Sequence, residues 1–366
     1  MNRDLLELYS DYLLSAFSYT TATGLSAMTG GEVSHDKVTR FLSGEEFSSA
    51  TLWKLVKPLV RRLENAEDGV LIVDDTIEEK PYTDESELIC WHYDHSQGRT
   101  VKGINLLSTL YQVGDLSIPV AFELIKKSEW VFNEKKQRWQ RKSPLSKNEH
   151  YRRMLWACQD NRIKFRYVLS DVWYSSSENM RYIKEDLGKE FIMPIKSNRK
   201  VALSLEDKKR GVYEQVGSME LEADTVVKVY LEQVEFPLLL AKQVFKNGDG
   251  GEGVLYLVGS DLTLDYELLT TIYQRRWKVE EYHKSLKVNA ALAKSPTKTI
   301  RTQSNHVFSS IYAFFKLERM KIAQKMNHFA LRSRLCVKAV QAAFTFKQPS
   351  RSCKALQLLG DGPTSA

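Results

Sequence analysis

The amino-acid sequence predicts an α/β protein in which a mixed β-sheet is flanked by helices. Three observations lead to this prediction. Residues 1–65 repeat apolar side chains at helical spacing, residues 69–174 contain strand-like segments with one helix among them, and residues 196–260 read as strands separated by glycine-rich turns. The sequence therefore predicts an N-terminal helical domain, a sheet covered by helices and a β-rich insertion.

The composition limits the possible classes of protein. A length of 366 residues with 43% hydrophobic side chains indicates two or three domains and enough apolar material for a buried core. No run of 18 apolar residues predicts a membrane span, and the first residues lack the order of a signal peptide, so we expect a cytoplasmic protein without a membrane partner. Cys90, His92 and His95 form a C-x-H-x-x-H group. Packing or hydrogen bonding is expected there rather than a zinc site, because no obvious fourth ligand lies nearby.

The positive charge is concentrated in two segments. The whole chain carries a net charge of +7, but residues 126–166 hold 13 basic and 4 acidic side chains, and residues 281–366 hold 15 and 3. Such concentration suits a polyanion, and nucleic acid is a better candidate than a membrane surface because no basic amphipathic helix with an exposed apolar face stands out.

The first 65 residues are expected to form helices with a possible helix-turn-helix. A Gly-Gly turn precedes a short helix capped by Ser34, and DNA contact is expected through Ser34, His35, Lys37 and Arg40. The alternative is an ordinary helical bundle, because this segment holds 7 basic and 8 acidic side chains.

Residues 69–174 predict the order strand, strand, strand, helix, strand. The strands are expected at 69–76, which ends in Asp74, Asp75 and Thr76, and at 101–113, 117–125 and 165–174. A capping box of Ser146 and Glu149 begins the helix, and Asp171 falls near the end of the last strand. The basic stretch 126–145 is expected to be a loop or an excursion from the sheet, in contact with DNA or with a second copy. Trp130 and Trp139 are expected there as packed anchors or as base-stacking groups.

Residues 273–287, YQRRWKVEEYHKSLK, are expected to lie within one helix that starts at Tyr266. At 100° per residue, one arc of about 80° collects five side chains: Tyr273, Arg276, Glu280, Lys284 and Lys287. A separate apolar stripe collects Leu268, Ile272, Val279 and Leu286, and the remaining side chains Lys278, Glu281 and His283 are expected at the surface. Glu280 is therefore predicted to be an ionised carboxylate among cations.

Two aspartates on strands and one glutamate on a helix can hold divalent cations. Mg²⁺ prefers oxygen ligands and keeps several waters, so few carboxylates suffice. Two such ions can activate a nucleophile and stabilise the leaving oxygen of a phosphodiester. Asp74, Asp171 and Glu280 are therefore candidate metal ligands.

The spacing Y-x2-R-x3-E-x6-K of Tyr273, Arg276, Glu280 and Lys287 resembles the signature of bacterial insertion-sequence transposases of the DDE class. The aspartate in a D-x-T context, Asp171 and the long β-rich segment before Glu280 fit the same family. The resemblance covers about residues 60–345. It implies an RNase H-like core in which Asp74, Asp171 and Glu280 bind two Mg²⁺ ions, for which Mn²⁺ substitutes.

The resemblance also implies the reaction and the partners. Family members hydrolyse the transposon ends and join the freed 3′ hydroxyls to target DNA. The resemblance therefore implies cut-and-paste transposition by a homodimer assembled on double-stranded DNA. Tyr273, Arg276, Lys284 and Lys287 would contact the DNA, namely the terminal inverted repeats and the target, at the bacterial nucleoid. The expected domains are an N-terminal helical domain (1–65), the two parts of the catalytic core (66–195 and 261–345), the insertion (196–260) and a tail (346–366).

Several alternatives remain at this point. Asp75 is a second candidate for the first ligand, although the D-x-T context and its position on the opposite strand face favour Asp74. A hairpin step that uses an aromatic side chain of the insertion has only Tyr213, Tyr230 or Phe236 available. A nuclease without strand transfer, or an inactive DNA-binding relative, would share the same residues.

Overall fold

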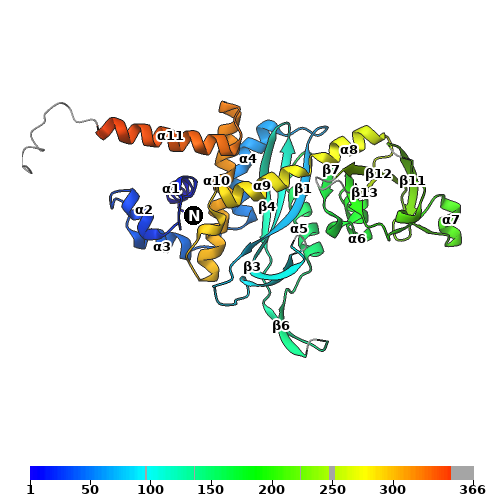
Figure 1. The fold of residues 1–366 in the computed structure, drawn as a ribbon, viewed down its shortest axis with the longest axis horizontal. Helices are drawn as coiled ribbons and strands as arrows, with labels where there is room; N and C mark the ends of the chain where they lie inside the picture. Colours follow the sequence, from blue (N-terminus) through cyan, green and yellow to red (C-terminus); the bar gives the residue numbers. More distant parts are fainter. Residues whose placement is uncertain (95–96, 136, 223, 247–251, 348–366) are drawn as a thin grey trace, which may run out of the picture.

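A single mixed sheet forms the centre of the molecule. The structure, a computed structural model, describes residues 1–94, 97–135, 137–222, 224–246 and 252–347. The sheet has eleven strands in the order β10-β9-β11-β12-β13-β8-β7-β1-β3-β2, with β4 paired to β3. Helices flank it, as Figure 1 shows. The predicted fold class is confirmed.

The core of the sheet combines an antiparallel meander with two parallel strands. β1 (Val70–Glu79) pairs antiparallel with β3 (Arg99–Val113), and β3 pairs with β2 (Cys90–Asp94) and with β4 (Leu116–Leu124). On its other side β1 pairs parallel with β7 (Tyr167–Ser170), which pairs parallel with β8 (Glu190–Ile195). The first four residues of β1 are fully buried and apolar, as expected for a central strand covered on both faces. This is the RNase H-like arrangement.

The β-rich segment extends this sheet. β13 (Glu252–Gly259) pairs with β8, and the sheet continues through β12 (Leu238–Lys246) and β11 (Val226–Leu231). The short strands β9 (Lys200–Ala202) and β10 (Glu214–Gln215) complete the edge, with α7 (Leu205–Arg210) and the 3-10 turn Val216–Ser218 beside them.

The N-terminal helices form a cluster that packs against the long helix α10 (Ile300–Gln324). They are α1 (Arg3–Ser15), α2 (Ala22–Met28), α3 (His35–Ser43) and α4 (Ser49–Leu63). Each begins with a side-chain cap, from Asn2, Thr21, Ser34 and Ser48 respectively. α1 and α3 lie against α10, α4 lies against β4, and α11 (His328–Lys347) follows α10 (Figure 1). None of the helices in the described part of the chain is long and apolar enough to cross a bilayer.

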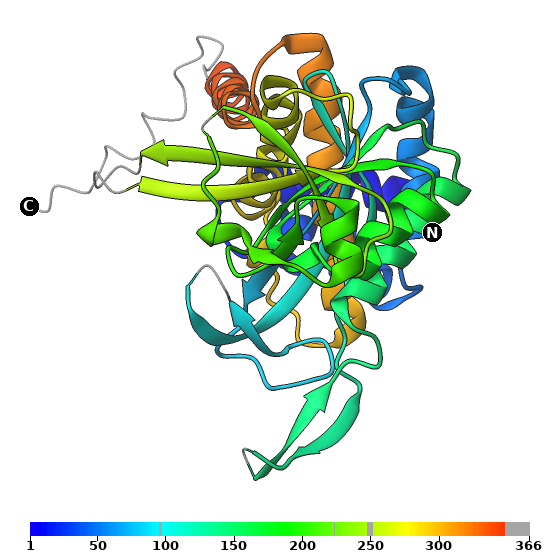
Figure 2. The same ribbon diagram turned by 90° about the vertical axis from the view of Figure 1, so that its right-hand side faces the viewer.

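Between β4 and β7 lie a hairpin and a helix. The stretch expected to be a loop or an excursion forms an antiparallel hairpin of β5 (Glu129–Asn133) and β6 (Arg138–Lys142), which projects from the body in Figure 2. The excursion from the body that was expected as the alternative to a loop is present, but its two strands were missed because charged residues interrupt the alternation that marks a strand. The next helix, α5 (Lys147–Asp160), begins with the predicted capping box of Ser146 and Glu149. After β7 come the 3-10 turn Val172–Tyr174, α6 (Ser177–Arg181) and the π turn Tyr182–Asp186.

The helix expected from Tyr266 onward is broken in two. α8 (Tyr266–Gln274) and α9 (Trp277–Val288) are separated at Arg275 and Arg276, whose backbone N–H groups donate to carbonyls three residues back. A 3-10 turn (Leu292–Lys294) follows α9. Because the break changes the rotation between the two parts, the predicted faces were wrong on both helices. Leu268 is 51% exposed, and His283 is buried at 7%.

The C-x-H-x-x-H group is only partly described. Cys90 and His92 are buried, with Cys90 Sγ 3.3 Å from His92 Nε2, and His95 lies outside the described residues. Burial, followed by the charges of Lys127 and Lys147, lowers the pKa of His92 to about 3.

Candidate active site

Two of the predicted carboxylates lie side by side because β1 and β7 are parallel neighbours. Val73 pairs with Ser170, so the next residues, Asp74 and Asp171, occupy adjacent positions. Asp171 follows β7 directly and caps the 3-10 turn, with its Oδ1 accepting from the N–H of Val172 at 2.6 Å. Parallel pairing thus brings together two residues that are far apart in the sequence.

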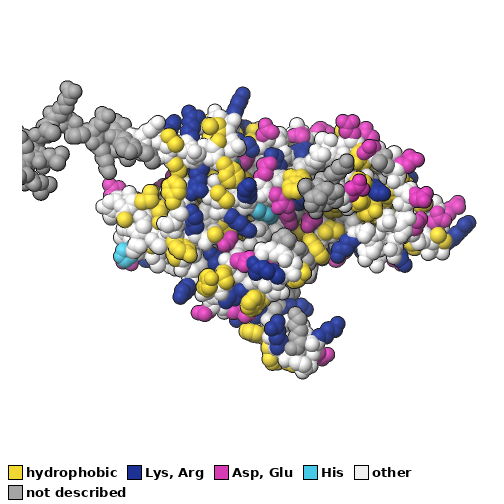
Figure 3. Space-filling model, in the orientation of Figure 1, with side chains coloured by type: hydrophobic (Ala, Val, Ile, Leu, Met, Phe, Trp, Pro, Cys, Tyr) yellow, Lys and Arg dark blue, Asp and Glu magenta, His cyan; other side chains and the backbone are white. Residues whose placement is uncertain are grey.

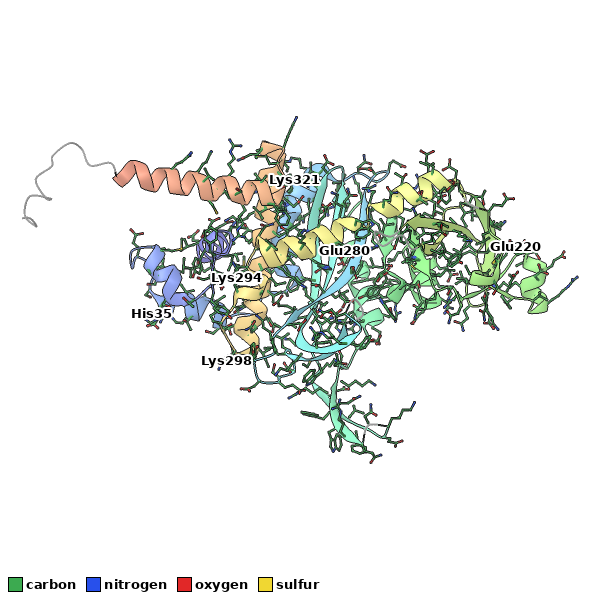
Figure 4. The ribbon with its side chains drawn as sticks, in the orientation of Figure 1. His35, Glu220, Glu280, Lys294, Lys298 and Lys321 are labelled. Atoms are coloured by element: carbon green, nitrogen blue, oxygen red, sulfur yellow. The ribbon has the colours of Figure 1, made fainter. Side chains whose placement is uncertain are left out.

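Helix α9 adds the third carboxylate to the same pocket. The pocket has a volume of about 670 Å³, and its lining includes Asp74, Asp171, Glu280, Lys284 and Lys287. Figure 4 shows Glu280 near the middle of the molecule, where α9 crosses in front of β1. In Figure 3 acidic and basic side chains meet on this central face. Five of the seven predicted site residues therefore line one pocket.

Arg276 connects two of these carboxylates. Its Nη1 lies 3.7 Å from Asp74 Oδ2 and 3.2 Å from Glu280 Oε1, and only 13% of its side chain is exposed. The guanidinium also lies over the rings of Tyr273, at 5.8 Å, and Trp277, at 5.4 Å. Tyr273 is itself 7% exposed, so it supports Arg276 from the protein side and does not line the pocket.

Asp74 and Asp75 both border the pocket but have different partners. Asp75 Oδ1 accepts a hydrogen bond from Tyr174 at 2.5 Å, while its Oδ2 accepts from Asn105 and Lys147, each at 2.7 Å. Among the described residues, the Asp74 side chain accepts only from the N–H of Asp75, at 2.8 Å, apart from its longer contact with Arg276. Asp75 was expected to point away from the site because side chains alternate along a strand, but it borders the pocket as well. Both of its carboxylate oxygens already accept hydrogen bonds.

These partners move the two pKa values in opposite directions. Burial, followed by the negative charges of Asp75 and Asp171, raises the pKa of Asp74 to about 8. Burial acts on Asp75 as well, but the charge and hydrogen bond of Lys147, with those of Tyr174 and Asn105, bring its pKa below the usual value. The site therefore holds more negative charge around Asp74 than its own cations offset.

The donor set fits a hard divalent cation. Asp74, Asp171 and Glu280 offer only carboxylate oxygens, which Mg²⁺ and Mn²⁺ prefer. As the side chains stand, no three His, Cys, Asp or Glu residues of the described chain converge closely enough to hold an ion. Glu280 is 47% exposed and directed to Arg276, so convergence requires this one surface side chain to turn.

The cations on α9 differ in their surroundings. Lys287 donates through Nζ to the carbonyl of Ile77 at 3.2 Å, which fixes it at the end of β1. Lys284 is exposed, with its Nζ 5.4 Å from the ring of Phe329. Both line the pocket and offer positive charge beside the carboxylates.

Several residues of the site were missed from the sequence. Trp173 and Tyr174 follow Asp171 so closely that their proximity could have been inferred, and Trp173 lines the pocket. Lys147 and Asn105 reach Asp75 only through the tertiary fold. His283 was expected at the surface, but it lines the pocket, and its Nε2 is buried without a hydrogen-bond partner among the described residues.

The other predicted contacts lie elsewhere. His35, Lys37 and Arg40 are exposed on α3, and Figure 4 shows His35 far from Glu280. None of the aromatic residues proposed for a hairpin step, Tyr213, Tyr230 and Phe236, is among the residues that line the pocket. Phe236 instead packs edge-on against Phe191, with ring centroids 6.3 Å apart.

Comparison with known proteins agrees with this geometry. The family model described as DDE superfamily endonuclease matches residues 1–212, which is more than half of the chain. The model described as transposase DDE domain matches residues 144–314, which include Asp171 and Glu280. No curated protein matches the sequence. The chain belongs to the DDE superfamily of endonucleases and transposases.

Proposed function

We propose that this protein is a transposase of the Y-R-E-K signature group that excises an insertion sequence and joins it to target DNA. The observation that carries the proposal is that Asp74, Asp171 and Glu280 line one pocket that basic residues of α9 also line. The proposed substrates are double-stranded DNA with terminal inverted repeats and a target duplex, bound by a homodimer at the bacterial nucleoid. Residues 1–65 form the proposed DNA-binding domain.

The proposed ligands of two Mg²⁺ ions are Asp74, Asp171 and Glu280, and Mn²⁺ is expected to substitute. Held by these residues, the ions would supply an activated nucleophile and would neutralise charge at the cleaved phosphodiester. Asp75 is proposed to hold Lys147, Asn105 and Tyr174 in place rather than to bind an ion, because its oxygens accept three hydrogen bonds.

The basic side chains are proposed to bind the DNA backbone. Lys284 and Lys287 line the pocket and would pair with phosphates next to the cleaved bond. Arg276, now paired with Glu280, would turn its guanidinium to a phosphate once the carboxylates bind cations, and a planar guanidinium suits a phosphate in two-point contact. Tyr273 would orient Arg276 through the ring contact described above.

The test is incubation with Mg²⁺ and DNA that carries the inverted repeats flanking the gene. Wild-type protein should release cut ends and joined products. Glu280→Gln should bind this DNA with unchanged affinity but cut it at least about 100-fold more slowly, because it removes one of the proposed metal ligands. A decrease of this size corresponds to an activation barrier that is higher by about 3 kcal/mol.

Glu281→Gln is the matched control, since Glu281 is the neighbouring residue on α9, is exposed and pairs with Lys278. It should cut like the wild type. Cleavage by Glu280→Gln at the wild-type rate would contradict the site assignment. Cut ends without joined products would favour the second candidate, a DDE endonuclease, which the description of the family model matching residues 1–212 supports.

A further inference from the structure

The β5–β6 hairpin carries a surface that the proposed reaction does not use. Trp130, Phe132 and Trp139 are 54%, 41% and 64% exposed, although such large side chains are normally buried. Trp130 pairs with Arg141 across the hairpin, and Phe132 pairs with Trp139. Because paired residues share a face, these four side chains form one surface, here called the aromatic face.

The aromatic face is held in shape by its own contacts. Arg141 lies over the Trp130 ring at 4.5 Å, and the rings of Phe132 and Trp139 meet edge-on at 5.6 Å. Arg141 also reaches Glu85, with its Nε 3.6 Å from Glu85 Oε1, which ties the hairpin to the body. Exposed apolar groups that are prearranged in this way mark a binding surface.

The charge around the aromatic face points to DNA. Residues 126–142 contain seven Lys or Arg and two Glu, a net charge of +5. Arg138 and Lys142 occupy the other face of β6, and Figure 3 shows basic and hydrophobic side chains together on the projecting hairpin. Two such hairpins would repel each other, and strands of five residues offer less surface than a stable dimer needs. A polyanion has the opposite charge.

The hairpin is close to the pocket along the chain. Lys142 ends β6, and Lys147, five residues later, begins α5 and lines the pocket. A five-residue strand spans roughly 17 Å, which is about half of a turn of duplex DNA. A two-stranded ribbon has the dimensions that the major groove admits.

We propose that the hairpin inserts into the major groove of double-stranded DNA beside the segment that occupies the pocket. The aromatic face contacts the groove wall and thymine methyl groups, while Arg138 and Lys142 pair with phosphates. This inference rests on the proposed function, because it assumes that DNA is the molecule in the pocket. It adds a second DNA-contacting element outside the cleavage site.

The test compares three full-length variants in binding to a 40-base-pair duplex that carries an inverted repeat, measured by fluorescence anisotropy at several salt concentrations. Trp130→Ala/Trp139→Ala should weaken binding about 10-fold or more without changing the salt slope. Arg138→Ala/Lys142→Ala should reduce that slope by about 2, since each phosphate contact contributes about 0.9. Trp156→Ala, at a 57% exposed tryptophan on α5, is the control and should bind like the wild type.

Each outcome decides the inference. If the Trp130→Ala/Trp139→Ala variant binds DNA with wild-type affinity, the inference is overturned. If that variant also loses self-association in sedimentation, the aromatic face is instead a surface between two copies of the protein. The unfolding midpoint should stay unchanged, because the replaced rings are exposed. If wild-type protein binds through the hairpin but never cuts, the proposed function fails and the inference stands; if it cuts while the variant binds normally, the inference alone fails.

Discussion

Asp74 and Asp75 are neighbours in the sequence with opposite electrostatic surroundings. Asp75 accepts hydrogen bonds from Lys147, Asn105 and Tyr174, whereas Asp74 lies near the negative charges of Asp75 and Asp171 and near the cation of Arg276. Ionisation of Asp75 therefore stabilises the folded protein, while ionisation of Asp74 in the absence of a bound cation destabilises it. A site of this kind gains stability when a cation binds.

The two aspartates should respond oppositely to pH. The folded-state pKa of Asp74 is raised to about 8, so its ionisation lowers stability as pH rises from about 4 to 8. In chelator, Asp74→Asn should therefore become more stable than the wild type over that range, with a constant difference above pH 8. The measurement is the free energy of unfolding in urea at each pH.

Asp75→Asn is the matched variant with the opposite sign. Its folded-state pKa is lowered, so the stabilisation is present above about pH 4 and is lost as pH falls through the folded-state value. Asp75→Asn should be less stable than the wild type at pH 7, and the difference should shrink in acid. Equal pH profiles for the two variants would contradict the electrostatic description of the pocket.

At the scale of elements, β1 and β3 depend on a glycine. A Cβ at Gly103 would lie 2.2 Å from the carbonyl oxygen of Glu78 on β1, so Gly103→Ala must push apart two paired strands. We expect a loss of more than about 2 kcal/mol in unfolding free energy, the size typical of overpacking against backbone. Chemical denaturation measures it.

Gly253→Ala is the control for this prediction. A Cβ at Gly253 would also come within 2.2 Å of another atom, but that atom is Cε2 of Phe245, a side chain that is 47% exposed and free to turn. The loss there should stay below about 1 kcal/mol. Similar losses of unfolding free energy in both variants would contradict this prediction, because they would show that the paired strands β1 and β3 accommodate a Cβ as easily as the exposed ring of Phe245 does.

The elements most readable from the sequence were those with strong local signals. The buried apolar run of β1, the long strand-like stretch of β3 and the capping box of Ser146 and Glu149 each gave an element close to its observed bounds. The hairpin β5–β6 and the break between α8 and α9 were missed. Charged residues interrupt the alternation of apolar and polar side chains in the hairpin. The helix break depends on tertiary packing, which a helical projection of the sequence does not include.

The geometry of the candidate site was partly predictable for the same reason. Asp74, Asp171 and Glu280 could be singled out from strand ends, helix position and family resemblance, and they line one pocket. The hydrogen-bond donors to Asp75 and the burial of His283 could not be predicted from the sequence, because they depend on how α5 and α9 lie on the sheet. Local patterns predict which element carries a group, whereas the contacts of that group come from tertiary packing.

At the scale of the whole molecule, α10 packs against β4 of the sheet and is joined to the N-terminal helices by buried polar side chains. Asn305 donates to the carbonyls of Leu42 and Glu45, each at 2.9 Å, and accepts from the N–H of Phe47 at 3.0 Å. His306 bridges the hydroxyl of Tyr9 and the carbonyl of Ala291, at 3.0 Å each. The expected DNA-binding helices are thus positioned relative to the pocket by hydrogen bonds as well as by apolar packing.

Removing Asn305 should loosen this connection. Asn305→Ala removes the partner of two buried backbone groups and one partly buried group, and each buried group left unpaired costs about 1–3 kcal/mol. We therefore expect a total loss above about 3 kcal/mol in unfolding free energy and faster proteolysis between α3 and α4. Ser310→Ala, on the same helix, removes a buried hydroxyl that has no hydrogen-bond partner among the described residues and should cost less than about 1 kcal/mol. If the two variants have the same unfolding free energy and the same rate of proteolysis, the three hydrogen bonds of Asn305 do not hold the N-terminal helices in place. Packing of α1 and α3 on α10 must then do so alone. If the protease cuts only Asn305→Ala faster, this variant should also cut inverted-repeat DNA more slowly. The reason is that the N-terminal helices proposed to bind the DNA would no longer be held in a fixed position relative to the pocket.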